Sequence, residues 1–265
     1  MVVDFHAHYF PDDIAGQALQ TLSESTPGMR AYTDGTLRGL LAAMDQAGID
    51  RAVNLPVATK PSQVPSINRA AVTSRSPRVI HFGALHPRAQ NLADDIRYLH
   101  DHGIRGVKLH PEYQDFYVDS PQMDECYGLL QDFGLIVVFH AGWDPGPFTR
   151  DHARPSALRT VHQRFPDLQM VAAHMGGLRM WDEVERELVG TGVYFDTSAA
   201  AEYMAPERFV SMVRTHGVQR VLFGTDTPWF DAAAARRWLE RLPLTAEERE
   251  ALLGKNAQVL AGIPT

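Results

Sequence analysis

The feature that most constrains the fold is a unit that recurs along the whole chain. An amphipathic stretch ends in a glycine, and a short apolar run rich in β-branched residues follows it. The glycines of five such units are Gly48, Gly103, Gly134, Gly192 and Gly217. Glycine readily takes the left-handed conformation that often caps the carboxyl end of a helix. Because continuously apolar runs are typical of parallel strands buried on both faces, the unit predicts a helix followed by such a strand.

Eight runs of this kind divide the chain. They cover residues 2–6, 52–56, 79–85, 106–110, 135–140, 169–174, 193–196 and 220–226. Helical patterns lie between them: Leu37, Leu40, Leu41 and Met44, for example, have the spacing of one buried helix face. A chain of 265 residues can hold one α/β barrel or two ordinary domains, and we find no linker in this one. We therefore predict an α/β fold, a single (β/α)8 TIM-barrel domain over residues 1–265.

A doubly wound open sheet is the alternative fold. It is disfavoured because no glycine-rich nucleotide-binding turn follows the first strand. The long, proline-bearing segments follow the predicted strands, and a barrel builds its active site from those loops. Residues 245–248 resemble a capping box that opens the last helix.

Five of the predicted strands end on metal-ligating or ionisable residues. These are His6 and His8, then His110, His140, His174 and Asp226. In a closed barrel the carboxyl ends of all strands converge on one mouth. A buried histidine or an N-capping aspartate explains any one of them alone, but their joint placement favours a metal site. Three imidazoles and a carboxylate suit Zn²⁺ or another borderline divalent ion.

Other polar residues lie near these strand ends. Side chains alternate along a strand, so His6 and His8 are expected on one face, with Asp4 one rung deeper as a partner of His6 or a structural group. N-capping is the default interpretation of Asp196, and Trp143 is a candidate for substrate contact.

Together these residues resemble the amidohydrolase superfamily, and more closely its amidohydrolase 2 branch of predicted TIM-barrel metal-dependent hydrolases. The resemblance is carried by His-x-His in the first strand, the later strand-end ligands, and the segments Gly-Val-Lys-Leu-His-Pro, His-Met-Gly-Gly, Phe-Gly-Thr-Asp-x-Pro and Gly-Lys-Asn-Ala. It implies that one Zn²⁺ is bound by the ligands His6, His8, His140 and Asp226. His174 would then lie beside the bound water, and Mn²⁺ is an alternative ion.

Lys108 lies near the place where binuclear members of the superfamily carry a carboxylated lysine. A second ion held through Lys108 is therefore an alternative to a single-ion centre. Otherwise Lys108 would be a cation for a substrate carboxylate. Lys108 and His110 share a face by alternation, so both are candidates for substrate binding.

The predicted function is metal-dependent hydrolysis of an amide, ester or lactone bond in a small molecule. Asp226 would take a proton from the attacking water, and His174 would bind the water or the developing oxyanion. Members of the branch also include nonoxidative decarboxylases of aromatic or unsaturated carboxylic acids, which is the first alternative. A noncatalytic barrel that binds metal or ligand is the second alternative.

Charge and composition bear on partners and location. The formal net charge of −7 argues against broad binding of nucleic acid or anionic membranes. The single cysteine, Cys126, fits a buried thiol in a reducing cytoplasm. The first strand begins at Val2, which leaves no room for a signal peptide, and no apolar run is long enough to span a membrane. We expect a cytoplasmic protein with a small-molecule substrate, and the sequence leaves open whether it is a homo-oligomer.

Overall fold

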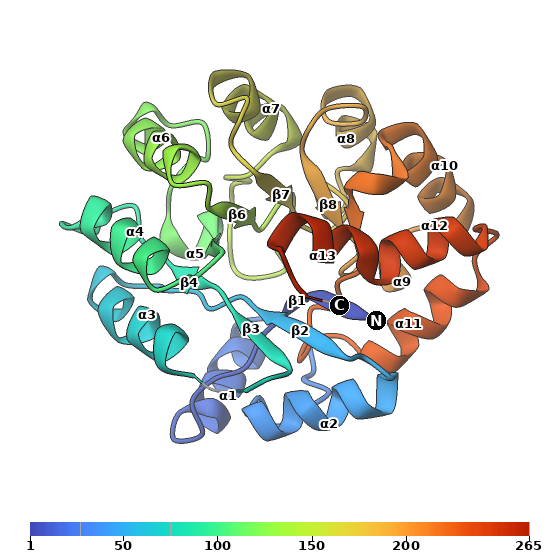
Figure 1. Cartoon of the computed structure of the whole chain (residues 1–265), viewed down its shortest axis with the longest axis horizontal. Helices are drawn as coiled ribbons and strands as arrows, with labels where there is room; N and C mark the ends of the chain where they lie inside the picture. Colours follow the sequence, from blue (N-terminus) through green and yellow to red (C-terminus); the bar gives the residue numbers. More distant parts are fainter. Residues whose placement is uncertain (27, 75, 265) are drawn as a thin grey trace.

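A parallel β-barrel forms the centre of the computed structural model, which describes residues 1–26, 28–74 and 76–264 (Figure 1). Its strands are β1 (Val3–Ala7), β2 (Arg51–Asn54), β3 (Val79–His81), β4 (Gly83–Ala84), β5 (Gly106–Leu109), β6 (Ile136–Phe139), β7 (Met170–Ala172), β8 (Tyr194–Asp196) and β9 (Val221–Leu222). Only Phe82 separates β3 from β4, so these two pieces occupy the single predicted strand 79–85. Within the described residues, the eight predicted strand positions are confirmed.

Backbone hydrogen bonds close the sheet into a barrel. The two parallel segments have the orders β1-β2-β3 and β4-β5-β6-β7-β8-β9. The first and last strands meet where the Phe5 N–H donates to the Phe223 carbonyl and the Asp226 N–H donates to the His6 carbonyl, each at 2.7 Å. Closure therefore brings the first strand-end ligands beside the last one.

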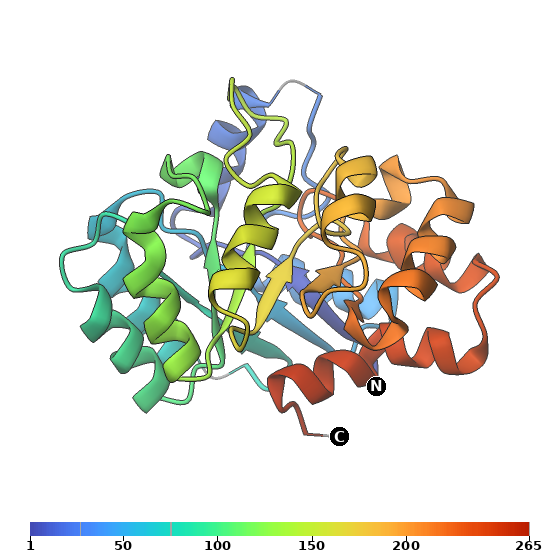
Figure 2. The same cartoon turned by 90° about the horizontal axis from the view of Figure 1, so that it is seen from above.

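Helices surround the barrel, as Figures 1 and 2 show. They are α1 (Ala15–Ser25), α2 (Leu37–Ala47), α3 (Val64–Thr73), α4 (Leu92–Asp101), α5 (Pro111–Gln114), α6 (Asp124–Asp132), α7 (Pro155–Arg164), α8 (Trp181–Glu187), α9 (Ala200–Tyr203), α10 (Pro206–His216), α11 (Ala232–Arg241), α12 (Ala246–Glu250) and α13 (Asn256–Ala261). Short helical turns are η1 (Pro61–Gln63), η2 (Pro121–Met123), η3 (Val218–Arg220) and the π-helical η4 (Ala251–Lys255). The (β/α)8 prediction is confirmed.

The barrel interior is apolar at the end opposite the predicted ligands. Phe5 and Phe82 meet edge to face there, with 5.7 Å between ring centroids. Ala257 and Ala261 of α13 belong to the same buried cluster, and Figure 2 shows α13 lying across this end, close to both termini. This packing closes one end of the barrel and leaves the other end for polar chemistry.

A register shift in β1 changes which residues point inward. Asp4 pairs with Ala52 and Ala7 pairs with Asn54, so three residue steps on β1 match two on β2. Phe5 and His6 are therefore both directed inward although they are consecutive. Asp4 does not share the face of His6 as the alternation predicted: its carboxylate accepts hydrogen bonds from the hydroxyl (2.5 Å) and the N–H (2.9 Å) of Thr225, which follows β9, and from the backbone N–H of His6 (3.0 Å). That part of the prediction is wrong because a bulge interrupts the alternation.

The predicted helix ends are confirmed in most places. Gly48 takes the left-handed conformation after α2, with φ 62° and ψ 36°. The capping box is present, since the Thr245 hydroxyl accepts from the Glu248 N–H at 3.1 Å and the Glu248 carboxylate accepts from the Thr245 N–H at 2.8 Å. The cap predicted at Gly192 is wrong, because Gly190, two residues earlier, takes the positive φ of 81°.

Candidate metal centre

Three predicted ligands converge at the mouth of the barrel. The Asp226 Oδ1 atom lies 3.4 Å from His6 Nε2 and 3.1 Å from His8 Nε2. In a tetrahedral site with bonds of about 2.0–2.1 Å to nitrogen and oxygen, neighbouring ligand atoms lie about 3.3 Å apart. The three atoms therefore have the spacing of ligands around one ion.

The outer nitrogens of both histidines are bound to acceptors. His8 Nδ1 lies 2.7 Å from the Leu55 carbonyl oxygen, and His6 Nδ1 lies 2.8 Å from Asp196 Oδ2. Because carbonyl and carboxylate oxygens only accept, both Nδ1 atoms must carry the proton. In the neutral rings, each Nε2 then presents a bare lone pair toward Asp226. Three acceptors that face one another favour a cation beside them, and the Lys108 ammonium, whose Nζ lies 3.4 Å from His6 Nε2, is the one that the protein itself supplies. Acceptors behind the ring, as at both Nδ1 atoms here, are typical of metal-binding histidines.

Burial sets the charge of these groups. It lowers the pKa of His6 to about 4, assisted by the Lys108 ammonium and opposed by Asp196 and Asp226, so the ring is neutral near pH 7. Burial alone would raise the pKa of Asp226, but the neighbouring His6, His8 and His174 outweigh it and hold the pKa below its ordinary value. A neutral His6 imidazole beside an ionised Asp226 carboxylate is the combination of protonation states that a metal ion needs.

Lys108 lies at the edge of this group and is almost wholly buried. Its Nζ is 3.4 Å from His6 Nε2. Burial lowers the pKa of Lys108 to about 8, although Asp196 and Asp226 favour its charged form. The Lys108 amine is therefore close enough to His6 to contact a metal ion or other ligand that His6 binds.

A hydrogen-bonded chain leads from His6 to His140. Ser198 Oγ donates to Asp196 Oδ1, so it accepts from His174 Nδ1 at 2.8 Å. His174 Nε2 then has the lone pair, and it accepts from His140 Nδ1 at 3.1 Å. Both nitrogens of His174 thus have protein partners. His174 also has a φ of 58°, a strained backbone conformation of the kind often found at functional sites.

His140 belongs to a second group of ligand atoms. Its Nε2 lies 3.6 Å from Asp144 Oδ2, and His110 Nε2 lies 3.5 Å from the same oxygen. Among the described residues, ligand atoms gather in three groups: His6, His8 and Asp226; His6, His174 and Asp196; and His110, His140 and Asp144. The predicted membership of His140 in the first group stays a prediction.

A family model described as amidohydrolase, Amidohydro_2, matches residues 3–262. The chain belongs to this amidohydrolase family. No curated protein sequence matches the chain. The solved structures similar to it include an uncharacterised TIM-barrel protein from Bordetella bronchiseptica, with 20% identity, 98% coverage of each chain and a TM-score of 0.75.

Two further similar structures are of enzymes. One is 2,6-dihydroxybenzoate decarboxylase from Rhizobium, with 17% identity, coverage of 99% of this chain and 98% of that chain, and a TM-score of 0.73. The other is 5-carboxyvanillate decarboxylase from Novosphingobium aromaticivorans with bound manganese, with 13% identity, coverage of 99% and 97%, and a TM-score of 0.74. At these identities the likeness shows the fold, which supports the TIM barrel.

Asp196 has a role that the sequence did not reveal. It does not cap α9, whose N-cap position is Ala199. Its Oδ2 binds His6, and its Oδ1 accepts from the N–H groups of His174 and Ser198, each at 3.1 Å. Its position at the end of a predicted strand was the available signal, because that position faces the mouth.

Trp143, the other candidate for substrate contact, lies in the loop after β6. The Arg179 guanidinium lies over its ring at 4.4 Å and over the ring of Tyr203 at 4.7 Å. The backbone N–H of Trp143 donates to the Leu178 carbonyl at 3.0 Å, which joins the loop after β6 to the loop after β7. Trp143 and Arg179 therefore pair an aromatic face with a cation.

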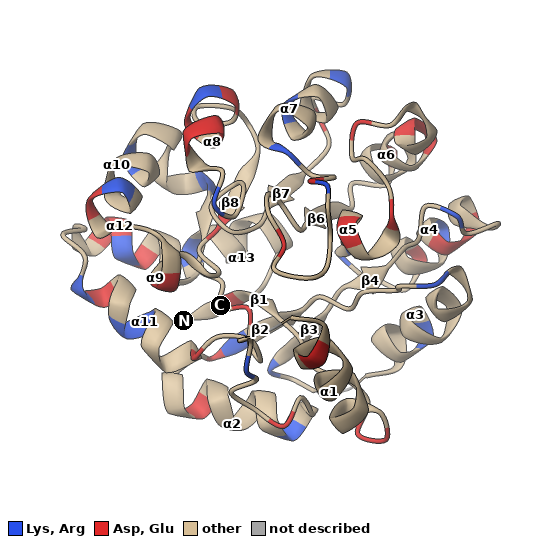
Figure 3. Ribbon diagram, turned by 180° about the vertical axis from the view of Figure 1, so that it is seen from behind, with Lys and Arg blue, Asp and Glu red and all other residues tan. Residues whose placement is uncertain are grey.

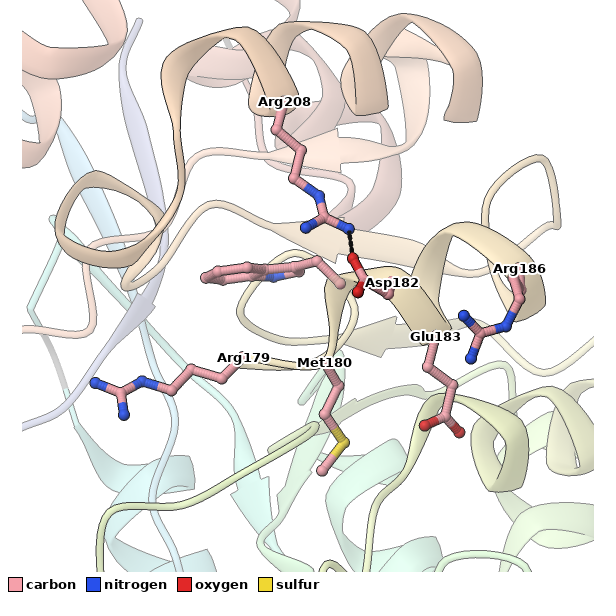
Figure 4. A pocket seen from close by; sticks show the side chains of 7 residues that line it. Arg179, Met180, Asp182, Glu183, Arg186 and Arg208 are labelled. Carbon is pink, nitrogen blue, oxygen red and sulfur yellow. Dashed lines mark hydrogen bonds and ion pairs between the residues drawn. The ribbon is translucent and has the colours of Figure 1, made fainter.

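The outer surface of the protein differs from the mouth of the barrel in the kind of residues that it carries. Figure 3 shows basic and acidic positions mixed along the outer helices. A surface hollow of about 360 Å³ lies over α8, where Arg208 pairs with Asp182 (Figure 4). None of the predicted site residues line it. Among the described residues, no helix is long and apolar enough to cross a membrane.

Proposed function

We propose that this amidohydrolase-family protein is a metal-dependent hydrolase of an amide, ester or lactone bond in a small molecule. The observation that carries the proposal is the meeting of three ligand atoms, two imidazole nitrogens and one carboxylate oxygen, around one point. His6, His8 and Asp226 would hold the ion, and the family resemblance adds His140 as a fourth ligand. When bound, the ion would act as a Lewis acid that polarises a carbonyl and lowers the pKa of water.

Asp226 is the proposed base. Its side chain is 12% exposed, so water and substrate can reach the carboxylate. Its low pKa keeps it ionised at neutral pH and able to accept a proton from the attacking water. The same carboxyl group would then return the proton to the leaving group. We propose that His174 Nε2, which has the lone pair, exchanges the His140 hydrogen bond for one from the attacking water; to bind the developing oxyanion, Nε2 would first have to take up a proton.

The ion favoured by the donor atoms is Zn²⁺, since two imidazoles and a carboxylate form a common zinc ligand set. Mn²⁺ is the second candidate, because the similar decarboxylase structure from Novosphingobium holds manganese. Lys108, His110 and Trp143 are the proposed substrate contacts, and Lys108 would face a substrate carboxylate.

Nonoxidative decarboxylation is the second candidate function. It is favoured by the decarboxylases among the similar solved structures and by the buried cation Lys108, which suits a carboxylate substrate. At the same centre, Asp226 or His174 would deliver a proton to the substrate carbon in place of taking one from water.

The deciding experiment compares two substrate panels on protein loaded with Zn²⁺ or with Mn²⁺. Amides, esters and lactones are assayed for hydrolysis, and aromatic and unsaturated carboxylic acids for release of CO₂. Hydrolysis that disappears in Asp226→Asn, with the fold retained by circular dichroism, supports the proposal. CO₂ release without hydrolysis supports the second candidate. Tight metal binding without turnover on either panel would identify a noncatalytic metal-binding barrel.

A further inference from the structure

Arg179, in the loop after β7, is a cation without an acidic partner. Its guanidinium carbon lies 4.4 Å from the ring centroid of Trp143 and 4.7 Å from that of Tyr203. Within the described part of the chain, no carboxylate forms an ion pair with it, whereas Arg208, which lines the same hollow, pairs with Asp182. The protein therefore holds the charge of Arg179 in place without neutralising it.

The backbone of Arg179 has an unusual conformation. Its φ is 58°, in the left-handed region that glycine adopts readily and that costs free energy for a residue with a side chain. The two cation–π contacts offset part of this cost. Residues that keep such conformations are often found at functional sites. The arginine side chain is thus the feature of this position that needs an explanation.

A hydrogen bond ties the segment of Arg179 to the mouth of the barrel. The Leu178 N–H donates to the carbonyl of Ala141, the residue after His140, at 2.8 Å. Trp143, whose ring contacts the guanidinium, lies three residues after His140, and three residues span at most about 11 Å. A small molecule held at the strand ends can therefore extend to the rim where Arg179 lies.

Aromatic rings continue from this cation around the rim. Tyr203 belongs to α9, which follows β8, and its ring meets that of Phe230 edge to face at 6.1 Å. Phe230 lies in the loop after β9, so Trp143, Arg179, Tyr203 and Phe230 come from four consecutive segments at the carboxyl ends of the strands. Tyr203 is 39% exposed, and Arg179 is exposed as well. A ligand that enters the mouth here meets a cation set among aromatic rings.

The hydrogen-bond donors of Arg179 define what it can bind. Cation–π contacts hold the guanidinium through its charge, and among the described residues no acceptor bonds to its N–H groups. These donors form a planar fork that matches the two oxygens of a carboxylate in parallel hydrogen bonds. Arginine is well suited to such pairing because its charge is permanent and its fork is rigid. A carboxylate is also flat, so it fits beside the flanking rings.

We propose that Arg179 binds a carboxylate of the substrate at the rim of the mouth, apart from the bond that reacts at the metal centre. Trp143 and Tyr203 position its guanidinium. The proposal rests on the proposed function, because it takes this mouth as the substrate site, and it names the substrate class: small molecules with a carboxylate remote from the reacting group. This role is distinct from that of Lys108, which is buried beside His6, whereas Arg179 is exposed.

The test measures binding of aromatic acids to Zn²⁺-loaded protein by isothermal titration calorimetry, which needs no turnover. The probes are phthalate, isophthalate, terephthalate and the longer para-linked biphenyl dicarboxylate. Each is compared with the acid in which a neutral acetyl group replaces one carboxylate. Wild type should bind at least one diacid about 10- to 100-fold more tightly than its acetyl counterpart, as expected for a charge-assisted pair. Arg179→Gln should bind the two within about threefold of each other.

Arg186→Gln is the matched control, because it removes the same charge from another exposed arginine that lines the hollow over α8. Figure 4 shows Arg179 and Arg186 on opposite sides of that hollow. The control should keep the wild-type preference for diacids. Arg179→Gly is a second test variant, since glycine takes the left-handed backbone conformation without strain, and it should lose the preference as Arg179→Gln does. Added salt should reduce the wild-type preference, because the charge of Arg179 is exposed.

A wild-type protein that prefers none of the diacids would overturn the proposal. A preference that survives in both Arg179→Gln and Arg179→Gly would also overturn it, and so would an equal loss in Arg186→Gln. The two proposals fail separately because binding is measured without turnover. Hydrolysis without a preference for diacids rejects the role of Arg179 alone, whereas the preference without hydrolysis rejects the proposed hydrolase alone.

Discussion

Replacing Asp196 by Asn should weaken metal binding by changing the tautomer of His6. Asp196 Oδ1 accepts from the N–H groups of His174 and Ser198 and from the Ser198 hydroxyl, so the amide oxygen of Asn keeps this position. The amide NH₂ then faces His6 Nδ1, where Oδ2 lies 2.8 Å away in the wild type. Because NH₂ only donates, His6 must place its proton on Nε2, the atom directed at Asp226.

The expected size follows from the number of ligands lost. Removing a carboxylate behind a metal-binding histidine typically costs 10- to 100-fold in metal affinity. In Asp196→Asn the His6 nitrogen ligand is lost as well, so we expect a loss of metal affinity at the upper end of this range. That is about 100-fold, or about 2.7 kcal/mol in binding free energy. The assay is competition for Zn²⁺ between the protein and a coloured chelator of known affinity, at neutral pH.

Asp4→Asn is the matched control, because it makes the same chemical change in a buried carboxyl group of the barrel. Asp4 contacts the hydroxyl of Thr225, which can reverse its direction and donate to Thr227 Oγ1, 2.9 Å away. Burial raises the pKa of Asp4 to about 7, so part of its charge is already absent at neutral pH. Zinc affinity should change less than threefold. An Asp196→Asn affinity equal to that of Asp4→Asn, with both proteins folded, would refute the tautomer argument.

Two further predictions concern stability. Burial lowers the pKa of His216 from 6.5 to about 4. As pH falls, this side chain therefore binds a proton in the unfolded state before it does so in the folded state, and the free energy of unfolding decreases by about 3 kcal/mol between pH 6.5 and pH 4. Urea unfolding of His216→Gln should therefore show a smaller acid loss than wild type by about that amount, and parallel pH profiles would contradict this. Gly142 has a φ of 84°, and an added Cβ would lie 2.3 Å from the Leu178 backbone nitrogen. Gly142→Ala should lower the free energy of unfolding by about 2–4 kcal/mol. Gly103→Ala is the control and should lower it by about 1–2 kcal/mol, because nothing lies within 4 Å of its added Cβ. Equal losses in the two variants would show that the contact with the Leu178 backbone is unimportant.

The fold could be predicted from the sequence because its signals are local. Each apolar run, and the glycine that precedes most of them, depends on neighbouring residues, so the positions of the barrel strands were readable from the pattern alone. Eight strands alternating with helices favoured a barrel, and the absence of a glycine-rich turn after the first strand disfavoured an open sheet. For the same reason His6, His8 and Asp226 were expected together, since each lies at a strand end and all strand ends meet at one mouth.

What surrounds these ligands was decided only by the tertiary structure. The bulge in β1 directs Phe5 and His6 inward together, and a bulge leaves no signal in a run of apolar residues. Asp196 supports His6 from 190 positions away, and Asp144 reaches His110 through a loop turn fixed by Gly146. Such contacts depend on side-chain rotamers and loop paths, which packing sets after the chain has closed. The sequence by itself therefore determined the barrel and the residues at its mouth, whereas long-range packing determined which carboxylate lies beside which imidazole.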